Sequence, residues 1–255
     1  SLIVWFSVSI FLIVRTYLKG KIAAAEFKED ELFWKAESTS IIGVIEESSA
    51  NVSTIMRRAG KVYAATLEGL AKKDAKKLKN AKKYTAKLDQ EVEELKDHIF
   101  YYIKNLNGHD VGASRFYLLV QDKFQDIVQS LELISKSSLR HVKNNHKGLK
   151  FNQIKDLKEI EDKLLDLFNK TRKEFENKNL DNLGGILNDK QALFSYVSKQ
   201  IEKQIERTKE PDSSSKNTTL YFTLLLETKD LISATLDVLE MYYGEHKKAV
   251  SLDKE

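Results

Sequence analysis

The sequence predicts an all-α protein, and three observations support this prediction. The chain of 255 residues contains one proline and ten glycines, so few residues interrupt helices. Charged residues make up 31% of the chain, and apolar residues recur at spacings of three and four along most of its length. These apolar stripes are narrow and regular, as in a helical bundle.

A charge-free apolar segment, LIVWFSVSIFLIV, extends from Leu2 to Val14. A membrane-spanning helix needs roughly 20 apolar residues. We therefore interpret residues 1–20 as the C-terminal part of a transmembrane helix, with the rest of the span upstream of Ser1 in a longer protein.

Basic residues follow this segment directly, at Arg15, Lys19 and Lys21. By the positive-inside rule they place residues 21–255 in the cytoplasm. A signal peptide and a buried core helix are the alternatives. The alanines at positions 23–25 are similar to a signal cleavage site, but basic residues are unusual between such a site and its apolar region.

The rest of the chain is predicted to contain a connector and six helices. Residues 21–37 are amphipathic and are interpreted as a juxtamembrane connector. Helix breakers then divide the helices into two units of three, residues 38–147 and 148–250. The expected helices are residues 38–70, 75–106, 113–144, 151–179, 183–209 and 218–245.

The third and sixth expected helices show a weak internal repeat. At an offset of 104 residues Tyr117 falls on Tyr221, and the triplet beginning at Asp126 falls on the triplet beginning at Asp230. The offset agrees with the division into two units, so we predict a duplicated three-helix unit.

Enzyme classes with a sequence signature are not indicated. The chain has no phosphate-binding glycine loop, zinc-binding His-Glu-x-x-His motif or nucleophile elbow. It also has no cysteine, and its five histidines are scattered without metal-ligand spacing. A di-metal carboxylate enzyme would need Glu-x-x-His ligands on facing helices, which are missing. We predict that the protein is not an enzyme.

Carboxylate pairs one helical turn apart are the main candidates for a binding site. Spacings of three and four place both carboxylates on one helix face, where they repel each other unless a cation lies between them. Hard oxygen ligands suit divalent ions or iron, although pairs of this kind also occur by chance on solvated faces. The candidate metal ligands are Glu93, Asp97, Asp122, Asp126, Glu227 and Asp230.

A run of seven lysines forms the strongest local charge feature of the chain. It is suited either to an anionic lipid surface or ligand, or to a solvated helix junction. No aromatic residues are interleaved with the lysines of this run, and 42 basic against 38 acidic residues leave a net charge of only +4. We therefore expect no nucleic-acid partner. The run comprises Lys72, Lys73, Lys76, Lys77, Lys79, Lys82 and Lys83.

Paired carboxylates in a duplicated three-helix unit resemble the PhoU-like family, and residues 33–246 resemble the cytoplasmic C-terminal extension of bacterial PiT-type inorganic phosphate transporters. Three stretches carry the resemblance: EVEELKDHIFYYIKNL from Glu91, VGASRFYLLVQDKFQDIVQSLELISKSSLRHVKNNHKGLKFNQIKDLKEI from Val111, and NTTLYFTLLLETKDLISATLDVLE from Asn217. The resemblance implies a PhoU-like bundle of two three-helix repeats, preceded by the end of a transmembrane helix.

The resemblance also implies metal binding through the family's E/D-x-x-x-D motifs. Glu93 with Asp97 and Asp122 with Asp126 match this motif, whereas Glu227 and Asp230 are three rather than four residues apart. No counterpart occurs in the fifth helix.

Taken together, the resemblance implies a cytoplasmic regulatory domain of a phosphate transporter in the bacterial inner membrane. Its partners would be the upstream permease domain of the same chain and membrane lipid near residues 1–35, and a homo-oligomer is compatible with it. The alternative is a membrane-anchored helical scaffold or sensor that binds a protein partner. The coding sequence upstream of Ser1 would distinguish the two.

Overall fold

A computed structural model describes residues 31–32, 38, 40–105, 111–210 and 213–252. The predicted membrane segment, residues 1–20, lies outside the described residues, as does nearly all of the predicted connector. Residues 32–255 form one compact unit. Within the described ranges, no helix is both long enough and apolar enough to cross a bilayer.

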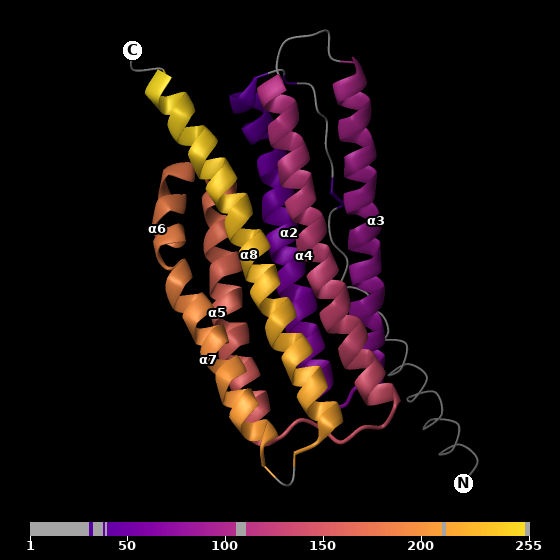
Figure 1. Ribbon diagram of the computed structural model, residues 1–255. Coiled ribbons are helices and arrows are strands. Elements are labelled where there is room, and N and C mark those ends of the chain that lie inside the picture. The colour runs from indigo at the N-terminus through magenta and orange to yellow at the C-terminus, as the bar shows by residue number, and fades with distance from the viewer. Residues whose placement is uncertain (1–30, 33–37, 39, 106–110, 211–212, 253–255) are drawn as a thin grey trace, which may run out of the picture. The chain divides into compact units, whose positions relative to one another are not determined.

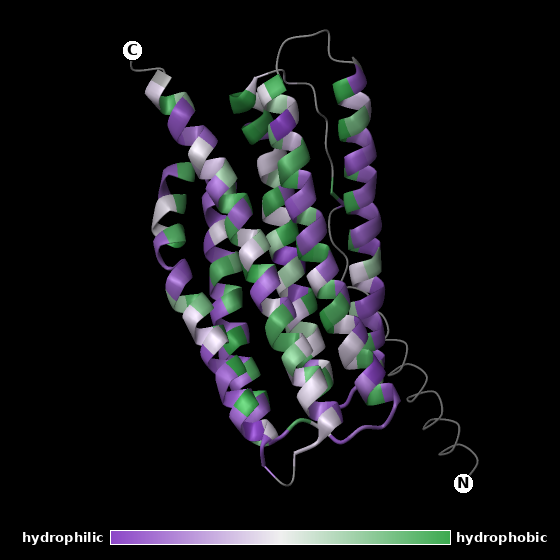
Figure 2. Ribbon diagram, viewed as in Figure 1, coloured by the Kyte–Doolittle hydropathy of each residue, from purple (hydrophilic) through white to green (hydrophobic). Residues whose placement is uncertain are grey.

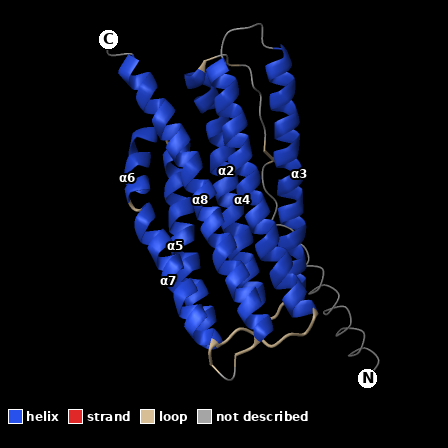
Figure 3. Cartoon of the chain, in the orientation of Figure 1, coloured by secondary structure: helices blue, strands red, loops and turns tan. Residues whose placement is uncertain are grey.

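The described residues are helical and contain no strand, which confirms the predicted all-α class (Figures 1 and 3). Five long helices lie roughly along one another, and a shorter α7 is preceded by the two-turn α6. In chain order the elements are α2 (Ile41–Ala71), α3 (Ala75–Asn105), α4 (Val111–Lys143), α5 (Phe151–Glu176), the 3₁₀ turn η1 (Leu180–Asn182), α6 (Leu183–Asn188), α7 (Lys190–Thr208) and α8 (Ser215–Leu252).

Helix α2 contacts α3, α4, α5 and α8, so it has neighbours on most of its circumference. Helix α4 packs between α3 and α8, and α8 also packs against α7 and α6. Figure 2 shows the consequence: α3 is mainly hydrophilic on the side in view, whereas apolar residues are frequent on α2 and α4. The core therefore follows α2 and α4.

Two of the predicted helices differ from those observed. The expected fifth helix, residues 183–209, is divided into α6 and α7 at Asn188 and Asp189, two residue types with low helix propensity. Gly184 lets α6 approach α8 closely, because a β-carbon at this position would lie 2.8 Å from the Tyr243 hydroxyl oxygen. The sixth helix is longer than predicted at both ends and ends at Leu252.

A buried ion pair joins α2 to α3. Arg58, only 1% exposed, donates from both terminal nitrogens to the Glu91 carboxylate, at 2.5 and 3.2 Å. The Glu91 carboxylate also accepts from the Leu32 backbone at 3.0 Å, and the Arg58 guanidinium lies 4.9 Å from the centre of the Tyr84 ring. Because both charges are removed from water, Arg58 depends on Glu91 for compensation, whereas Glu91 also has the Lys87 ammonium 3.6 Å away.

We predict that Glu91→Ala lowers the free energy of unfolding by about 3–5 kcal/mol, because it leaves the Arg58 charge buried without a partner. The matched control is Glu93→Ala on the same helix, where the side chain is 51% exposed and the expected change is within about 0.5 kcal/mol. Urea unfolding followed by circular dichroism measures both. Equal effects of the two variants would contradict the assigned role of the ion pair.

Three helices are followed, two residues after their last residue, by a residue with a left-handed backbone conformation. These residues are Lys73 after α2, Asn145 after α4 and Lys178 after α5, with φ of 52°, 53° and 54°. Glycine is the usual residue at such a position because it has no β-carbon to clash with the backbone. The two lysines therefore hold a conformation that costs them roughly 1 kcal/mol.

Lys178→Gly is expected to raise the free energy of unfolding by up to about 1 kcal/mol, because it relieves this conformation. The same substitution in the middle of α7, Lys199→Gly, is expected to lower it by about 1 kcal/mol. Thermal or urea unfolding of the two variants should thus give shifts of opposite sign. Destabilisation by Lys178→Gly would show that its backbone conformation is not strained.

Candidate functional site

The predicted metal ligands lie on two separate surfaces. Glu93 and Asp97 are exposed on α3, and the Glu93 carboxylate has the Lys96 ammonium 3.6 Å away on its own helix. By contrast, Asp126 of α4 and Glu227 and Asp230 of α8 line one groove between these two helices, with a volume of about 430 Å³. The structure therefore brings together three of the six candidates.

We call this hollow the acidic groove; it is formed by residues 123–133 of α4 and residues 227–237 of α8. Two further charged residues line it that were not predicted from the sequence. Asp237 lies two helical turns beyond Asp230 and adds another carboxylate, whereas Lys123 contributes an ammonium from α4. The spacing of seven between Asp230 and Asp237 places them on the same helix face, so the sequence contained a signal for Asp237.

Lys123 is the positive centre of the acidic groove. Its ammonium lies 2.9 Å from Asp126, 3.6 Å from Asp237 and 3.7 Å from Asp122. The hydrogen bond to Asp126 and the surrounding carboxylates raise the pKa of Lys123, so this side chain stays charged. The Lys123 ammonium is therefore a cation, supplied by the protein itself, that lies between carboxylates of α4 and α8.

In the part of the chain that the structure describes, no three His, Asp or Glu side chains are placed to hold a metal ion together. Lys123 already neutralises Asp126 in the groove, and Glu93 and Asp97 lie elsewhere. Metal binding by the six candidates stays a prediction, and the mechanism proposed below includes no step that uses a metal.

Glu227 is half-buried in the acidic groove, and its surroundings raise the pKa of its carboxyl group. Burial raises its pKa, the negative charge of Asp230 raises it further, and a hydrogen bond with Ser130 offsets only part of this. The carboxylate of Glu227 therefore holds its proton to a higher pH than an exposed glutamate does. Glu227 lies one helical turn from the buried Leu224 and Leu231 on α8, which explains this burial.

Equivalent tyrosines anchor α4 and α8 in the two halves of the bundle. The buried Tyr117 hydroxyl of α4 donates to Glu47 of α2 at 2.7 Å. Similarly, the buried Tyr221 hydroxyl of α8 donates to Asp156 of α5 at 3.4 Å. In both cases a tyrosine on the last helix of a predicted three-helix unit is bonded to a carboxylate on the first helix of that unit.

A second pair of buried hydroxyl contacts joins α8 to α2. Tyr63 of α2 and Thr228 of α8 are 2.8 Å apart, and Tyr242 of α8 donates to Ser48 of α2 at 2.6 Å. Because the Thr228 hydroxyl itself donates to the Leu224 carbonyl at 2.6 Å, the Tyr63 hydroxyl must be the donor in the first contact. These bonds fix the position of α8 along α2.

We expect Glu227→Gln to flatten the dependence of stability on pH. The folded protein raises the pKa of Glu227, so it binds more protons than the unfolded chain between the unfolded and folded pKa values. The free energy of unfolding of the wild type therefore falls as pH rises through this window, and the Gln variant lacks this component. Urea unfolding between pH 4 and pH 8, roughly the range in which carboxylates and histidines titrate, measures it. Glu202→Gln, exposed on α7, is the control and should keep the wild-type slope.

Comparisons with known proteins identify the fold. No protein-family model matches the sequence, and no curated protein sequence is significantly similar to it. The structure is similar to the crystal structure of the phosphate transport system regulatory protein PhoU from Streptococcus pneumoniae, with a TM-score of 0.62 and 13% sequence identity. The match covers 80% of this chain and 95% of that protein. The chain therefore has a PhoU-like fold, as predicted.

Proposed function

We propose that this chain is the cytoplasmic, PhoU-like regulatory domain of an inorganic phosphate transmembrane transporter. It would contribute to phosphate uptake and to the control of that uptake, without an enzymatic step. The observation that carries the proposal is the structural match to a phosphate transport regulator along nearly all of that protein's length. The apolar segment supports attachment to the bacterial inner membrane, and the basic residues after it support a cytoplasmic position for the domain.

The proposed mechanism is a change in helix packing that reaches the membrane part through the start of α2. Helix α2 contacts both α4 and α8, and the chain before Ile41 leads toward the apolar segment. A ligand or partner that favours one packing of α8 against α2 would therefore bias the position of the chain that enters the domain. The partners in this proposal are the upstream permease domain and lipid near residues 1–35.

The contact between Tyr63 and Thr228 offers a specific test, because it links α8 to α2. Thr228→Val removes the hydroxyl that accepts from Tyr63, whereas Thr235→Val makes the same change at a buried site where the hydroxyl bonds only within α8. We expect Thr228→Val to alter the ratio of phosphate uptake between phosphate-starved and phosphate-replete cells by roughly twofold to fivefold. Thr235→Val should leave this ratio at the wild-type value.

The measurement is uptake of radiolabelled phosphate by bacteria that express the full-length gene at matched protein levels. A further arm deletes residues 38–255. Unchanged uptake and unchanged regulation in the deletion strain would exclude the proposed role. An upstream coding sequence without a multi-span permease would instead favour the membrane-anchored scaffold.

A further inference from the structure

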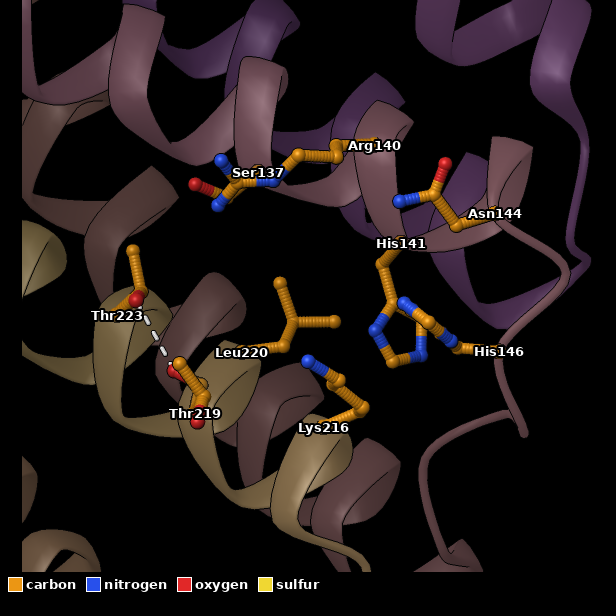
Figure 4. A pocket seen from close by; sticks show the side chains of 9 residues that line it. All are labelled: Ser137, Arg140, His141, Asn144, His146, Lys216, Thr219, Leu220 and Thr223. Carbon is orange, nitrogen blue, oxygen red and sulfur yellow. Dashed lines mark hydrogen bonds between the residues drawn. The ribbon is translucent and has the colours of Figure 1, made fainter.

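A second hollow lies between the end of α4 and the start of α8, and its chemistry is opposite to that of the acidic groove. Its volume is about 270 Å³. Figure 4 shows Arg140 on the α4 side and Lys216 on the α8 side, with Leu220 between them. We call this hollow the basic pocket; Ser137, His141, Asn144, His146, Thr219 and Thr223 complete its lining.

No carboxylate lines the basic pocket. Among the ion pairs of the described residues, none includes Arg140 or Lys216. The acidic groove differs, because its lining includes both carboxylates and Lys123, which forms an ion pair with Asp126. The basic pocket therefore contains two permanent positive charges without an acidic side chain in its wall.

The position of Lys216 makes this charge imbalance greater. Lys216 lies in the first turn of the 38-residue helix α8, where the helix dipole disfavours a cation and favours an anion. Arg140 is in the last turn of α4, where the dipole favours it. An anion in the pocket would be attracted by both side chains and would also compensate the start of α8.

The lysine run predicted from the sequence contributes to the same end of the bundle. Lys73, in the turn after α2, lies within 2.9 Å of the position that a β-carbon of Gly148 would occupy. The Gly148 carbonyl in turn accepts from the Asn217 side chain of α8 at 2.7 Å. Lys73 is therefore close to the α4–α5 connector and the start of α8, and it adds to the positive potential there.

One histidine of the basic pocket, His141, responds to these surroundings. His141 is buried, and its Nε2 atom lies 2.8 Å from the Lys147 carbonyl oxygen. Burial lowers the pKa of His141, and the positive charges of His146 and Lys73 lower it further, against the opposing effect of the bond to Lys147. The neutral His141 ring then donates to Lys147 and holds the connector against the pocket.

We propose that the basic pocket binds the phosphate group of a small soluble anion, with inorganic phosphate as the simplest case. The guanidinium of Arg140 presents paired donors that match two phosphate oxygens, and Lys216 adds a second charge from the opposite wall. The pocket volume of about 270 Å³ is large enough for a hydrated phosphate. It is below the roughly 300–1,000 Å³ of pockets that hold drug-sized ligands. This site follows from its own charges and does not depend on the proposed transporter role.

The test is isothermal titration calorimetry of the full chain, in a mild non-ionic detergent, with inorganic phosphate at constant ionic strength. We expect saturable binding of phosphate by the wild type, and at least a roughly tenfold higher Kd for the double variant Arg140→Gln, Lys216→Gln. The control is Lys136→Gln, Lys229→Gln, which removes the same net charge from the same two helices outside the pocket. It should bind as the wild type does.

Three results would overturn the proposal. They are no saturable phosphate binding by the folded wild type, equal weakening in both double variants, and binding of vesicles rich in phosphatidylglycerol without binding of soluble phosphate. The last result would assign the positive charges to a lipid surface instead. Circular dichroism of each variant confirms the fold, and the uptake assay above is independent of these outcomes, so the two proposals fail separately.

Discussion

The bundle depends on the burial of α2, because this helix has neighbours on most of its faces. Its buried polar residues cannot reach water and depend on partners from those neighbours. Arg58 meets Glu91 of α3, Tyr63 meets Thr228 of α8, and Ser48 accepts from Tyr242. Each bond joins α2 to a different position on the surrounding helices, so together they fix register as well as proximity. Apolar side chains alone would allow these helices to slide.

The seam between α4 and α8 carries two charged hollows of opposite sign. In the acidic groove, the Lys123 ammonium lies within 3.7 Å of three aspartates from the two helices and offsets part of their negative charge. In the basic pocket, Arg140 lies on the α4 side and Lys216 on the α8 side, without a carboxylate in the wall (Figure 4). The same pair of helices thus contains one hollow in which the protein supplies a partial counter-charge and one that is suited to an anion from solution. This contrast follows from local charge and needs no assumption about the transporter.

The helices could be predicted from the sequence because apolar spacing is a local property. The first four observed helices begin and end within a few residues of the expected bounds, since glycine, asparagine and polar connectors mark their ends. The division at Asp189 was missed because the apolar pattern continues through it. Besides the low helix propensity of Asn188 and Asp189, α6 lies against α8 near Gly184, and such a tertiary contact leaves no periodic signal in the sequence.

The candidate site was harder to predict than the fold. The spacing of Asp126, Glu227 and Asp230 indicated helix faces, but not which faces would meet. Only the packing of α4 on α8 brings these residues together, and it leaves Glu93 and Asp97 on α3. Arg140 and Lys216 are 76 positions apart and belong to no motif. Their proximity results from antiparallel packing of the end of α4 on the start of α8.

Helix α8 is continuous from Ser215 to Leu252, which corresponds to about 57 Å at 1.5 Å per residue. It borders the basic pocket with its first turns, the acidic groove with its middle and α6 with its last turns. A continuous hydrogen-bonded helix resists stretching, so it behaves as a stiff rod on the scale of a domain. A displacement of α8 along its axis at Lys216 would therefore move Glu227, Asp237 and Tyr242 by a similar distance.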